Sequence, residues 1–198
     1  MSHFFAFFAR MRTILRWGLM HNTRPENLAE HSLMTAAIAH GLAVIRRDVF
    51  GGEADPGVCA AAALYHDAPE ILTGDLPTPV KYFTPALRAA YSDIEEWSSA
   101  RLLSLLPEEL RPAYGPLLSQ GGQPEAVRTL VHAADKLAAY LKCLEELRAG
   151  NAEFRDAERQ TLAKLEAMAI PEVDYFLAHF AASFRLTLDE LHSHKTEE

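Results

Sequence analysis

The chain has 198 residues, of which 49% are apolar and 23% are charged, and its net charge is −8. This length and composition fit one globular domain with a sizeable core and argue against disorder. The acidic balance, with no block of Lys and Arg, disfavours general affinity for a nucleic-acid polymer or an anionic membrane, so an anionic ligand needs a local cationic pocket.

Apolar residues recur every three or four positions along almost the whole chain, and strand signals are nearly absent, which predicts an all-α fold. The first predicted helix opens with the aromatic run Phe4–Phe8, which is too short for a signal or membrane-spanning segment. The two cysteines, Cys59 and Cys143, lie in apolar helical patterns and predict small core residues rather than a disulfide or a zinc knot. We therefore expect a cytoplasmic protein with no membrane contact.

Arg16-Trp17 follows the first helix and leads into a polar connection. A second helix is expected from about Asn27 to Arg47, with Asn27 and Glu30 as an N-cap pair. His31 lies in its first turn, on the inward face that is expected to carry Met34, Ile38, Gly41, Leu42 and Ile45.

A third helix is expected from Gly57 to about Asp67 and ends in an unusual stretch. Residues 65–75 contain one imidazole, His66, and three carboxylates, Asp67, Glu70 and Asp75. Pro69 cannot continue a helix, so a break is expected at Asp67-Ala68, followed by a short helix that starts with Pro69 and Glu70. The segment Asp75–Pro79 is expected to be extended or turn-like.

Thr84-Pro85 is expected to cap a fourth helix with inward residues Leu87, Tyr91, Ile94, Trp97, Leu102 and Leu105. After a loop at Gln120–Pro124, a long helix is predicted from Glu125 to Arg148, and Asp135 stands inside its apolar stripe. Two more helices, Ala152 to Met168 and Pro171 to Phe184, complete the set. Residues 1–198 are predicted to form a single compact multi-helix domain whose polar tail frays from about residue 186.

Three inward polar sites thus lie on three predicted helices: His31, His66-Asp67 and Asp135. Taken singly, each has an ordinary explanation, such as a hydrogen-bonded core histidine or a solvated His-Asp pair at a helix end. Aspartate, however, is almost never buried unpaired. Two imidazoles and two carboxylates form a workable ligand set for Mn, Fe, Co or Zn, so the joint pattern indicates one divalent metal ion.

This order of residues resembles the H…HD…D signature of the HD-domain phosphohydrolases, and within them the bacterial HD-domain 5′-deoxynucleotidases. The resemblance extends over nearly the whole chain, and its most specific parts are Arg16-Trp17 and the block Leu72–Phe83. The other matching segments are Ser2-His3-Phe4-Phe5-Ala6, Glu30-His31-Ser32, Tyr65-His66-Asp67-Ala68, Glu70, Ala139–Leu147 and Ala149-Gly150-Asn151. Gly18 stands where the pattern has Pro, which could loosen the substrate loop, and Pro69 stands where it has a small polar residue.

The resemblance implies an HD-domain bundle that hydrolyses deoxyribonucleoside 5′-monophosphates to nucleoside and phosphate, usually as a homodimer. It implies one divalent metal ion held by His31, His66, Asp67 and Asp135. The implied substrate contacts are Arg16, Trp17, His31, Asp67, Asp75, Leu76, Pro77, Thr78 and Asp135.

The residues themselves agree with this chemistry. A metal with open coordination positions activates water and polarises a phosphoryl group. Glu70 is expected to orient or deprotonate that water, or to manage the leaving-group proton, unless it is a solvated carboxylate at a helix start. Arg16 is expected to bind the phosphate, the alternative being a surface arginine. Trp17 is expected to stack on the base or wall the sugar pocket, the alternative being simple core packing.

Asp75 and the following Leu76-Pro77-Thr78 are expected to form a rigid turn that holds the sugar 3′-hydroxyl. His132, one turn before Asp135, is expected to lie outside the ligand set or at the surface. Two other functions stay open. One is an HD hydrolase of a cyclic nucleotide or a deoxynucleoside triphosphate, which would want more cationic residues than Arg16, Lys81 and Arg10 provide. The other is a non-catalytic helical module that keeps the metal for stability.

Overall fold

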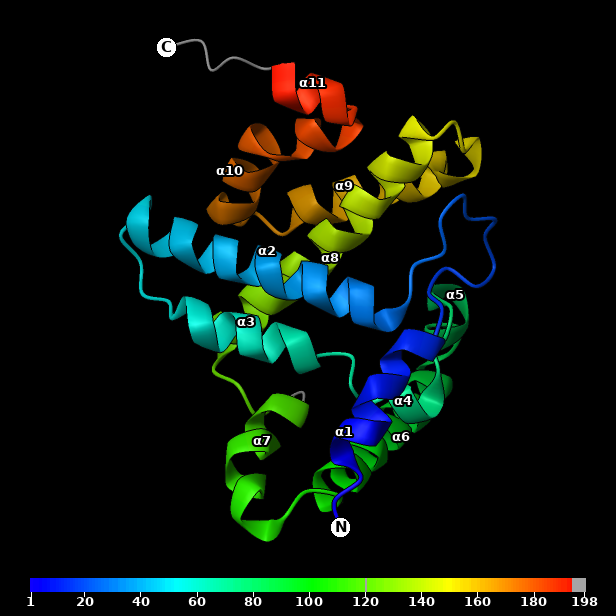
Figure 1. The fold of residues 1–198 in the computed structure, drawn as a ribbon, viewed down its shortest axis with the longest axis vertical. Coiled ribbons are helices and arrows are strands. Elements are labelled where there is room, and N and C mark those ends of the chain that lie inside the picture. The colour runs from blue at the N-terminus through cyan, green and yellow to red at the C-terminus, as the bar shows by residue number, and fades with distance from the viewer. Residues whose placement is uncertain (120, 194–198) are drawn as a thin grey trace.

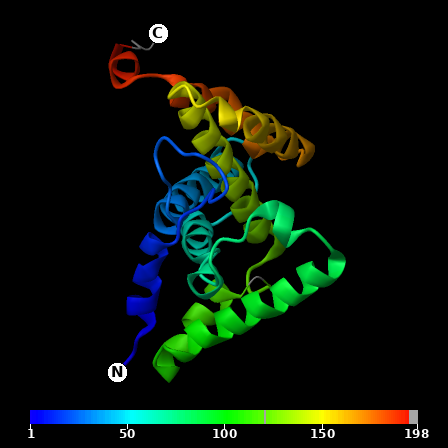
Figure 2. The same ribbon diagram turned by 90° about the vertical axis from the view of Figure 1, so that its right-hand side faces the viewer.

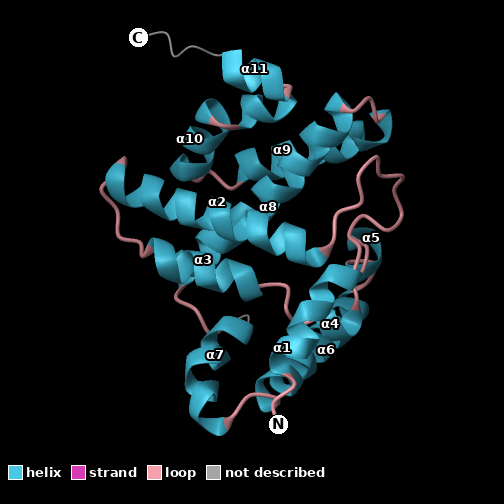
Figure 3. Ribbon diagram, viewed as in Figure 1, coloured by secondary structure: helices cyan, strands magenta, loops and turns pink. Residues whose placement is uncertain are grey.

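The structure is a computed structural model that describes residues 1–119 and 121–193. Within these residues it is helical, with no strand beyond an isolated bridge between Leu15 and Asn27, so the all-α prediction is confirmed (Figure 3). The α-helices are α1 Phe4–Phe8, α2 Leu28–Asp48, α3 Pro56–Tyr65, α4 Glu70–Thr73, α5 Thr78–Lys81, α6 Pro85–Ser104, α7 Arg111–Leu118, α8 Glu125–Arg148, α9 Arg155–Ala167, α10 Pro171–His179 and α11 Leu188–Ser193. The 3₁₀ segments are Ala9–Thr13, Glu108–Leu110, Ala152–Phe154 and Ala181–Arg185.

The helices α2, α3 and α8 pack against one another at the centre of the molecule (Figure 1). Their contact faces alternate small and large apolar residues, such as Ala39, Leu42, Ala63 and Leu137, all fully buried. By length and apolar composition α2 could cross a membrane, but half of that stretch is buried within the fold. Polar residues on the facing sides of these three helices therefore lie inside the protein.

The remaining helices cover the two ends of this centre. The helices α9, α10 and α11 lie at the end that holds the C-terminus, α1, α4, α6 and α7 lie at the other, and α5 lies at the side, level with the centre (Figures 1 and 2). A second, smaller core joins this second group and contains Phe4, Ala68, Leu102, Leu106 and Leu118. It fixes the turn after α3, where Ala68 is fully buried.

Local capping explains where the helices begin. Asn27 and Glu30 form the predicted capping box at α2. Asp55 accepts hydrogen bonds from the amides of Gly57 and Val58 at α3, and Thr84 accepts one from the amide of Leu87 at α6. Each cap satisfies amides that lack a partner within the helix.

Other expectations need correction. The helix α3 ends at Tyr65, two residues earlier than expected, and residues 66–69 form the turn before α4. Thr78 and Pro79 are not extended but begin α5, because proline is tolerated in a first helical turn. Leu188–Ser193 is helical rather than frayed, and residues 194–198 of the expected tail lie outside the described part.

The predictions of which residues face inward were also partly wrong for two helices, α2 and α6. Met34 on α2 is 39% exposed. On α6, Leu87, Ile94 and Trp97 are exposed, Leu105 is half-buried, and the buried residues are Tyr91, Glu95, Ser98 and Leu102. The helix is rotated so that Glu95 meets Lys81 of α5, with 2.7 Å between Oε1 and Nζ. The inward side of α6 therefore carries a charged residue with a partner as well as apolar residues.

Candidate active site

Side chains from three parts of the chain converge at the centre of the α2–α3–α8 packing. His31 comes from α2, His66 and Asp67 from the turn after α3, and Asp135 from α8. His31 Nε2 lies 3.1 Å from Asp135 Oδ1 and 3.6 Å from Asp67 Oδ2. His66 Nε2 lies 3.1 Å from Asp67 Oδ2 and 4.0 Å from Asp135 Oδ1. The structure therefore brings together all four residues that the sequence predicts as metal ligands.

The geometry of the histidines fits a cation. His66 Nδ1 lies 2.6 Å from the carbonyl oxygen of Ala63, and a donated hydrogen bond there leaves the lone pair on Nε2. That Nε2 is buried without a well-aligned hydrogen bond, although Asp67 is close to it. His31, Asp67 and His66 each offer an atom within 4.8 Å of the others, a spacing that could hold a metal ion. A buried, unpaired nitrogen beside two carboxylates is costly without such a partner.

The charges of the cluster favour ionised carboxylates. Burial alone raises the pKa of Asp67, but His66 and His31 outweigh it and lower the pKa to about 2. Burial likewise opposes ionisation of Asp135, yet His31 and Lys136 hold its pKa well below the usual range. Burial lowers the pKa of His66, but Asp67 and Asp135 raise it to about 9. A bound cation would take the place of the proton that the imidazoles and carboxylates share.

A cavity of about 350 Å³ opens beside this cluster. Glu70 lines it and is 9% exposed, and its Oε2 is buried without a hydrogen-bond partner. Burial, Asp67 and Asp75 together raise the pKa of Glu70 to about 9. The carboxyl group can therefore carry a proton at neutral pH, so Glu70 is not the solvated helix-start residue that was its alternative.

The sequence interpretation named Asp135 and His132 but missed Arg128 and Lys136, which complete the α8 wall of this cavity. Arg128, His132 and Lys136 line it together with Asp135, and Lys136 Nζ lies 2.8 Å from Asp135 Oδ2. Positions three, four and seven apart share one face of a helix, so the spacing from Asp135 is the signal for Arg128 and His132, whereas Lys136 directly follows Asp135 in the chain. Lys81 of α5 also lines the cavity.

Arg16 is half-buried and points at the cluster rather than into solvent. Its Nη1 lies 3.3 Å from Asp67 Oδ2, and its Nε lies 3.3 Å from Glu26 Oε2. Burial works against its charge, but Asp67, Asp135 and Glu26 raise its pKa above the ordinary value. The surface-arginine alternative is therefore wrong.

Trp17 lies next to Arg16 and is half-buried. Its Nε1 donates to Glu26 Oε2 at 3.2 Å, and its ring packs 5.3 Å from the ring of Phe154. Its backbone φ of 59° is unusual for a bulky residue and requires support from neighbouring groups. Neither Arg16 nor Trp17 is among the residues that line the 350 Å³ cavity.

The segment after α4 approaches the same charges. Gly74 adopts a left-handed φ of 74°, which glycine allows without strain, and turns the chain into Asp75. Asp75 contributes to the raised pKa values of both Arg16 and Glu70, so its carboxylate acts on both groups. Leu76 and Pro77 are half-buried and lead into α5 at Thr78.

Comparisons with known proteins agree with this arrangement. The sequence profile of the 5′-deoxynucleotidase YfbR-like family matches residues 3–184. The 5′-deoxynucleotidase of Vibrio atlanticus is 50% identical over 190 residues, which are 96% of this chain and 98% of that protein. The 5′-deoxynucleotidase YfbR of Escherichia coli is 49% identical over 190 residues, 96% of each chain.

Two solved structures have the same fold. An HD-domain phosphohydrolase from Listeria innocua has a TM-score of 0.79 at 27% identity and covers 92% of this chain and 88% of its own. The HD phosphohydrolase of cyanophage S-2L, solved with dA and one catalytic Zn²⁺ ion, has a TM-score of 0.64 at 20% identity and covers 90% and 96%. At 20% identity, the similarity to the cyanophage protein is evidence for the fold alone. The family match extends over nearly the whole chain, and the relatives are 49–50% identical to it. The chain therefore belongs to the 5′-deoxynucleotidase YfbR-like family of HD-domain proteins.

Proposed function

We propose that this protein is a metal-dependent 5′-deoxynucleotidase. It hydrolyses a deoxyribonucleoside 5′-monophosphate to the deoxynucleoside and inorganic phosphate, the activity for which its relatives of 49–50% identity are named. The observation that carries the proposal is the convergence of His31, His66, Asp67 and Asp135 beside a cavity that Glu70 also lines.

We assign these four residues as ligands of one divalent ion. The set of two nitrogens and two oxygens accepts Mn, Fe, Co or Zn. When bound, such an ion polarises the phosphoryl group and lowers the pKa of a coordinated water. Lys136 and the backbone carbonyl of Ala63 orient two of the ligands, Asp135 and His66, through the contacts described above.

The protein's own residues supply the remaining steps. Arg16, which already faces Asp67, binds the phosphate through its planar guanidinium. Glu70 holds or moves a proton at Oε2, either at the attacking water or at the 5′-oxygen that leaves. We assign Trp17 and the segment Asp75–Thr78 to the deoxyribose and the base, where a close wall at the 2′ position would favour deoxyribose over ribose.

One observation favours a second candidate function. Arg128 and Lys136 join Lys81 at the cavity, which gives it more cationic groups than the sequence suggested. Such a wall could bind a longer phosphate chain, as in a deoxynucleoside triphosphate. Two of these cations already pair with Glu95 and Asp135, so they are not free to bind a triphosphate without rearrangement.

A substrate panel separates these functions. The metal-loaded protein is expected to release phosphate from deoxynucleoside 5′-monophosphates and to act at least about tenfold less efficiently on the matching ribonucleotides, because one desolvated hydroxyl group costs over 1 kcal/mol. Phosphate, pyrophosphate and triphosphate are measured for each substrate at the same metal concentration. Release of triphosphate from deoxynucleoside triphosphates, with no phosphate from monophosphates, would reject the proposal.

We also propose that the enzyme acts in the cytoplasm as a homodimer. Support for the homodimer comes from exposed apolar residues on α5, on α6 and on the connection between them, here called the α6 face. It consists of Val80, Tyr82, Phe83, Leu87, Ile94 and Trp97, whose exposed fractions run from 37% to 79%. Contiguous exposed apolar surface on a small protein marks a contact with another molecule, and a symmetric dimer covers the same face on both subunits.

Trp97→Glu is therefore expected to convert a dimer into a monomer. Trp97 is 61% exposed, so the change costs little within one chain but places two like charges in a symmetric contact. Leu33→Glu on α2 is the matched control. Leu33 is similarly exposed, at 67%, but it belongs to α2 and not to the α6 face. Sedimentation velocity measures the mass of each. A dimer that survives Trp97→Glu would show that the α6 face is not the contact.

A further inference from the structure

A second buried cluster of charges lies on α8, away from the proposed metal ligands. Lys142 and Glu146 are one turn apart, 6% and 1% exposed, and 2.5 Å separates Nζ from Oε1. They fall in the segment Ala139–Leu147, to which no role has yet been attached. A buried ion pair of this kind adds little stability compared with apolar residues of similar volume, so its presence calls for another explanation.

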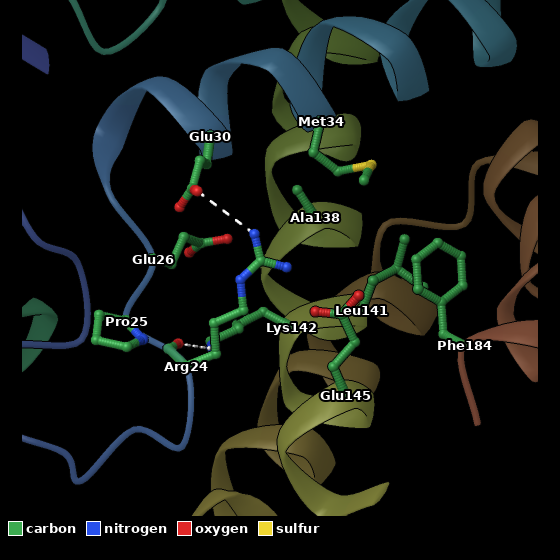
Figure 4. A pocket seen from close by; sticks show the side chains of 10 residues that line it. All are labelled: Arg24, Pro25, Glu26, Glu30, Met34, Ala138, Leu141, Lys142, Glu145 and Phe184. Carbon is green, nitrogen blue, oxygen red and sulfur yellow. Dashed lines mark hydrogen bonds and ion pairs between the residues drawn. The ribbon is translucent and has the colours of Figure 1, made fainter. Parts of the chain in front are cut away.

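The partners of this pair belong to the loop that follows Trp17. Glu146 Oε2 accepts hydrogen bonds from the amide and hydroxyl of Thr23, at 2.9 and 2.8 Å, and Oε1 accepts one from the amide of Arg24 at 3.2 Å. Lys142 Nζ donates to the carbonyl oxygen of Arg24 at 2.6 Å (Figure 4). The two α8 side chains thus hold the backbone of a segment that lies more than one hundred residues away in the sequence.

Asn151 completes the arrangement from the turn after α8. Its Nδ2 donates to Glu146 Oε2 at 2.8 Å and to the carbonyl oxygen of His21 at 2.7 Å. Burial alone raises the pKa of Glu146, but the hydrogen bonds from Lys142, Asn151 and Thr23 lower it to about 2. The carboxylate is therefore ionised at neutral pH and accepts all of these bonds at once.

The loop held in this way is the one that presents Arg16 and Trp17. Its far end carries Glu26, whose Oε2 accepts from both Arg16 Nε and Trp17 Nε1. Two backbone hydrogen bonds, each 2.9 Å long, join the two ends of this loop. The amide of Arg16 donates to the carbonyl oxygen of Glu26, and the amide of Leu28 donates to the carbonyl oxygen of Ile14. Residues 21–24 lie in the chain between Arg16-Trp17 and Glu26, so the anchor on α8 restrains the segment that joins the guanidinium facing Asp67 to its partner Glu26.

We infer that Lys142, Glu146 and Asn151 are positioning residues that hold the 16–26 loop so that Arg16 meets the substrate phosphate. This inference rests on the proposed function of Arg16. The three residues do not touch the metal ligands in any contact described above, so they act through the loop. Small displacements of a group that binds the reacting phosphate have large effects on rate, which makes a rigid anchor on the core helix useful.

The test uses Glu146→Gln, which keeps the size of the side chain and removes its charge. The variant is expected to reduce kcat/KM for a deoxynucleoside 5′-monophosphate by about 10- to 100-fold, since a displacement near 1 Å can cost about 100-fold. Glu145→Gln is the matched control, because Glu145 is an exposed neighbour on the same helix. It is expected to stay within about twofold of wild type.

A double-mutant cycle with Arg16→Ala shows whether the effect passes through Arg16. If Glu146 acts by placing Arg16, then Glu146→Gln has almost no further effect on kcat/KM once Arg16 is absent. If the role is only structural, the two losses multiply, and the inference fails. Metal affinity, measured by calorimetry, is expected to be the same for wild type and Glu146→Gln, and a large change in it would also overturn the inference.

Asn151→Ala provides a second route if Glu146→Gln folds poorly. It removes the two hydrogen bonds donated by Nδ2 and the one that Oδ1 accepts from the amide of Glu153, while leaving the ion pair in place. It is expected to lower kcat/KM in the same direction and to be non-additive with Arg16→Ala; additive losses or an unchanged kcat/KM reject the inference. Wild-type protein that fails to hydrolyse any deoxynucleoside 5′-monophosphate would instead reject the proposed function. The two failures are therefore distinguishable.

Discussion

Replacing Glu70 with glutamine is expected to lower kcat for deoxynucleoside 5′-monophosphates by about 10²–10⁴-fold, the range that a general acid or base contributes. Oε2 of Glu70 is buried, lacks a hydrogen-bond partner and belongs to a residue that lines the cavity beside the proposed metal ligands. Glutamine has the same shape but cannot transfer a proton. Phosphate release at saturating substrate measures kcat, and elemental analysis measures the metal bound per chain.

The metal content is expected to stay at the wild-type level, since Glu70 is not among the proposed ligands. Glu96→Gln on α6, at an exposed position, serves as the control and should retain full activity. A Glu70→Gln protein that keeps its metal and more than a tenth of the wild-type kcat would show that Glu70 is not the general acid or base. A variant that loses the metal would move Glu70 into the ligand set.

Glu70→Gln also has a pH signature in the metal-free protein. The folded pKa of about 9 lies above the unfolded value of 4.5, so the folded state binds more protons between those two pH values. The contribution of Glu70 to stability therefore falls as pH rises through this window, in addition to the loss from His66, whose pKa is also raised to about 9. Metal-free Glu70→Gln is expected to lose less stability than wild type between about pH 5 and pH 9. Parallel urea titrations at several pH values measure the difference, and identical pH profiles would contradict the burial of an ionisable Glu70.

The parts of the fold that were predictable are those set by local chemistry. Asn27 with Glu30, Asp55 before Pro56, and Thr84 before Pro85 each place a capping oxygen beside free amides, and the helices begin there. The period of 3.6 residues also placed His31 and Asp135 on the inward faces of α2 and α8. His31 Nε2 and Asp135 Oδ1 then lie 3.1 Å apart, because α2 and α8 pack directly against each other.

The orientation of α6 was not predictable, because this helix has apolar residues on two faces. Tyr91 and Leu102 lie on one side, and Ile94 and Trp97 on the other. The side that faces inward also buries Glu95, which pairs with Lys81 of α5, and Ser98. Neither preference is visible in the hydrophobic period of the sequence.

The anchoring of the 16–26 loop was hidden for a different reason. The contact between Lys142 and the carbonyl oxygen of Arg24 spans 118 residues, and its acceptor is a backbone atom. A backbone carbonyl or amide has no signature in the sequence, so the pairing emerges only when the helices have packed. The α8 wall of the cavity was easier to predict from the sequence, since Lys136 adjoins Asp135 in the chain.

Removal of the metal is expected to abolish phosphate release and to lower the melting temperature, and the addition of Mn²⁺, Co²⁺ or Zn²⁺ is expected to restore both. A ligand that binds only the folded state at 1,000 times its Kd adds about 4 kcal/mol of stability. For a chain of this size each kcal/mol corresponds to roughly 2–4 °C, so the predicted shift is about 8–16 °C. Scanning calorimetry with and without a chelator measures it.

His66→Ala and His132→Ala form the matched pair that tests the ligand set. Both histidines line the 350 Å³ cavity, but only His66 directs a ring nitrogen at the carboxylates of Asp67 and Asp135. His66→Ala is expected to lose the metal-dependent rise in melting temperature, and His132→Ala is expected to keep it. Loss of the rise in His132→Ala alone would place the cation elsewhere in the cavity. Because the readout is a shift in melting temperature, it reports on metal binding even if catalysis fails for another reason, and this separates the geometry of the ligands from the chemistry of the substrate.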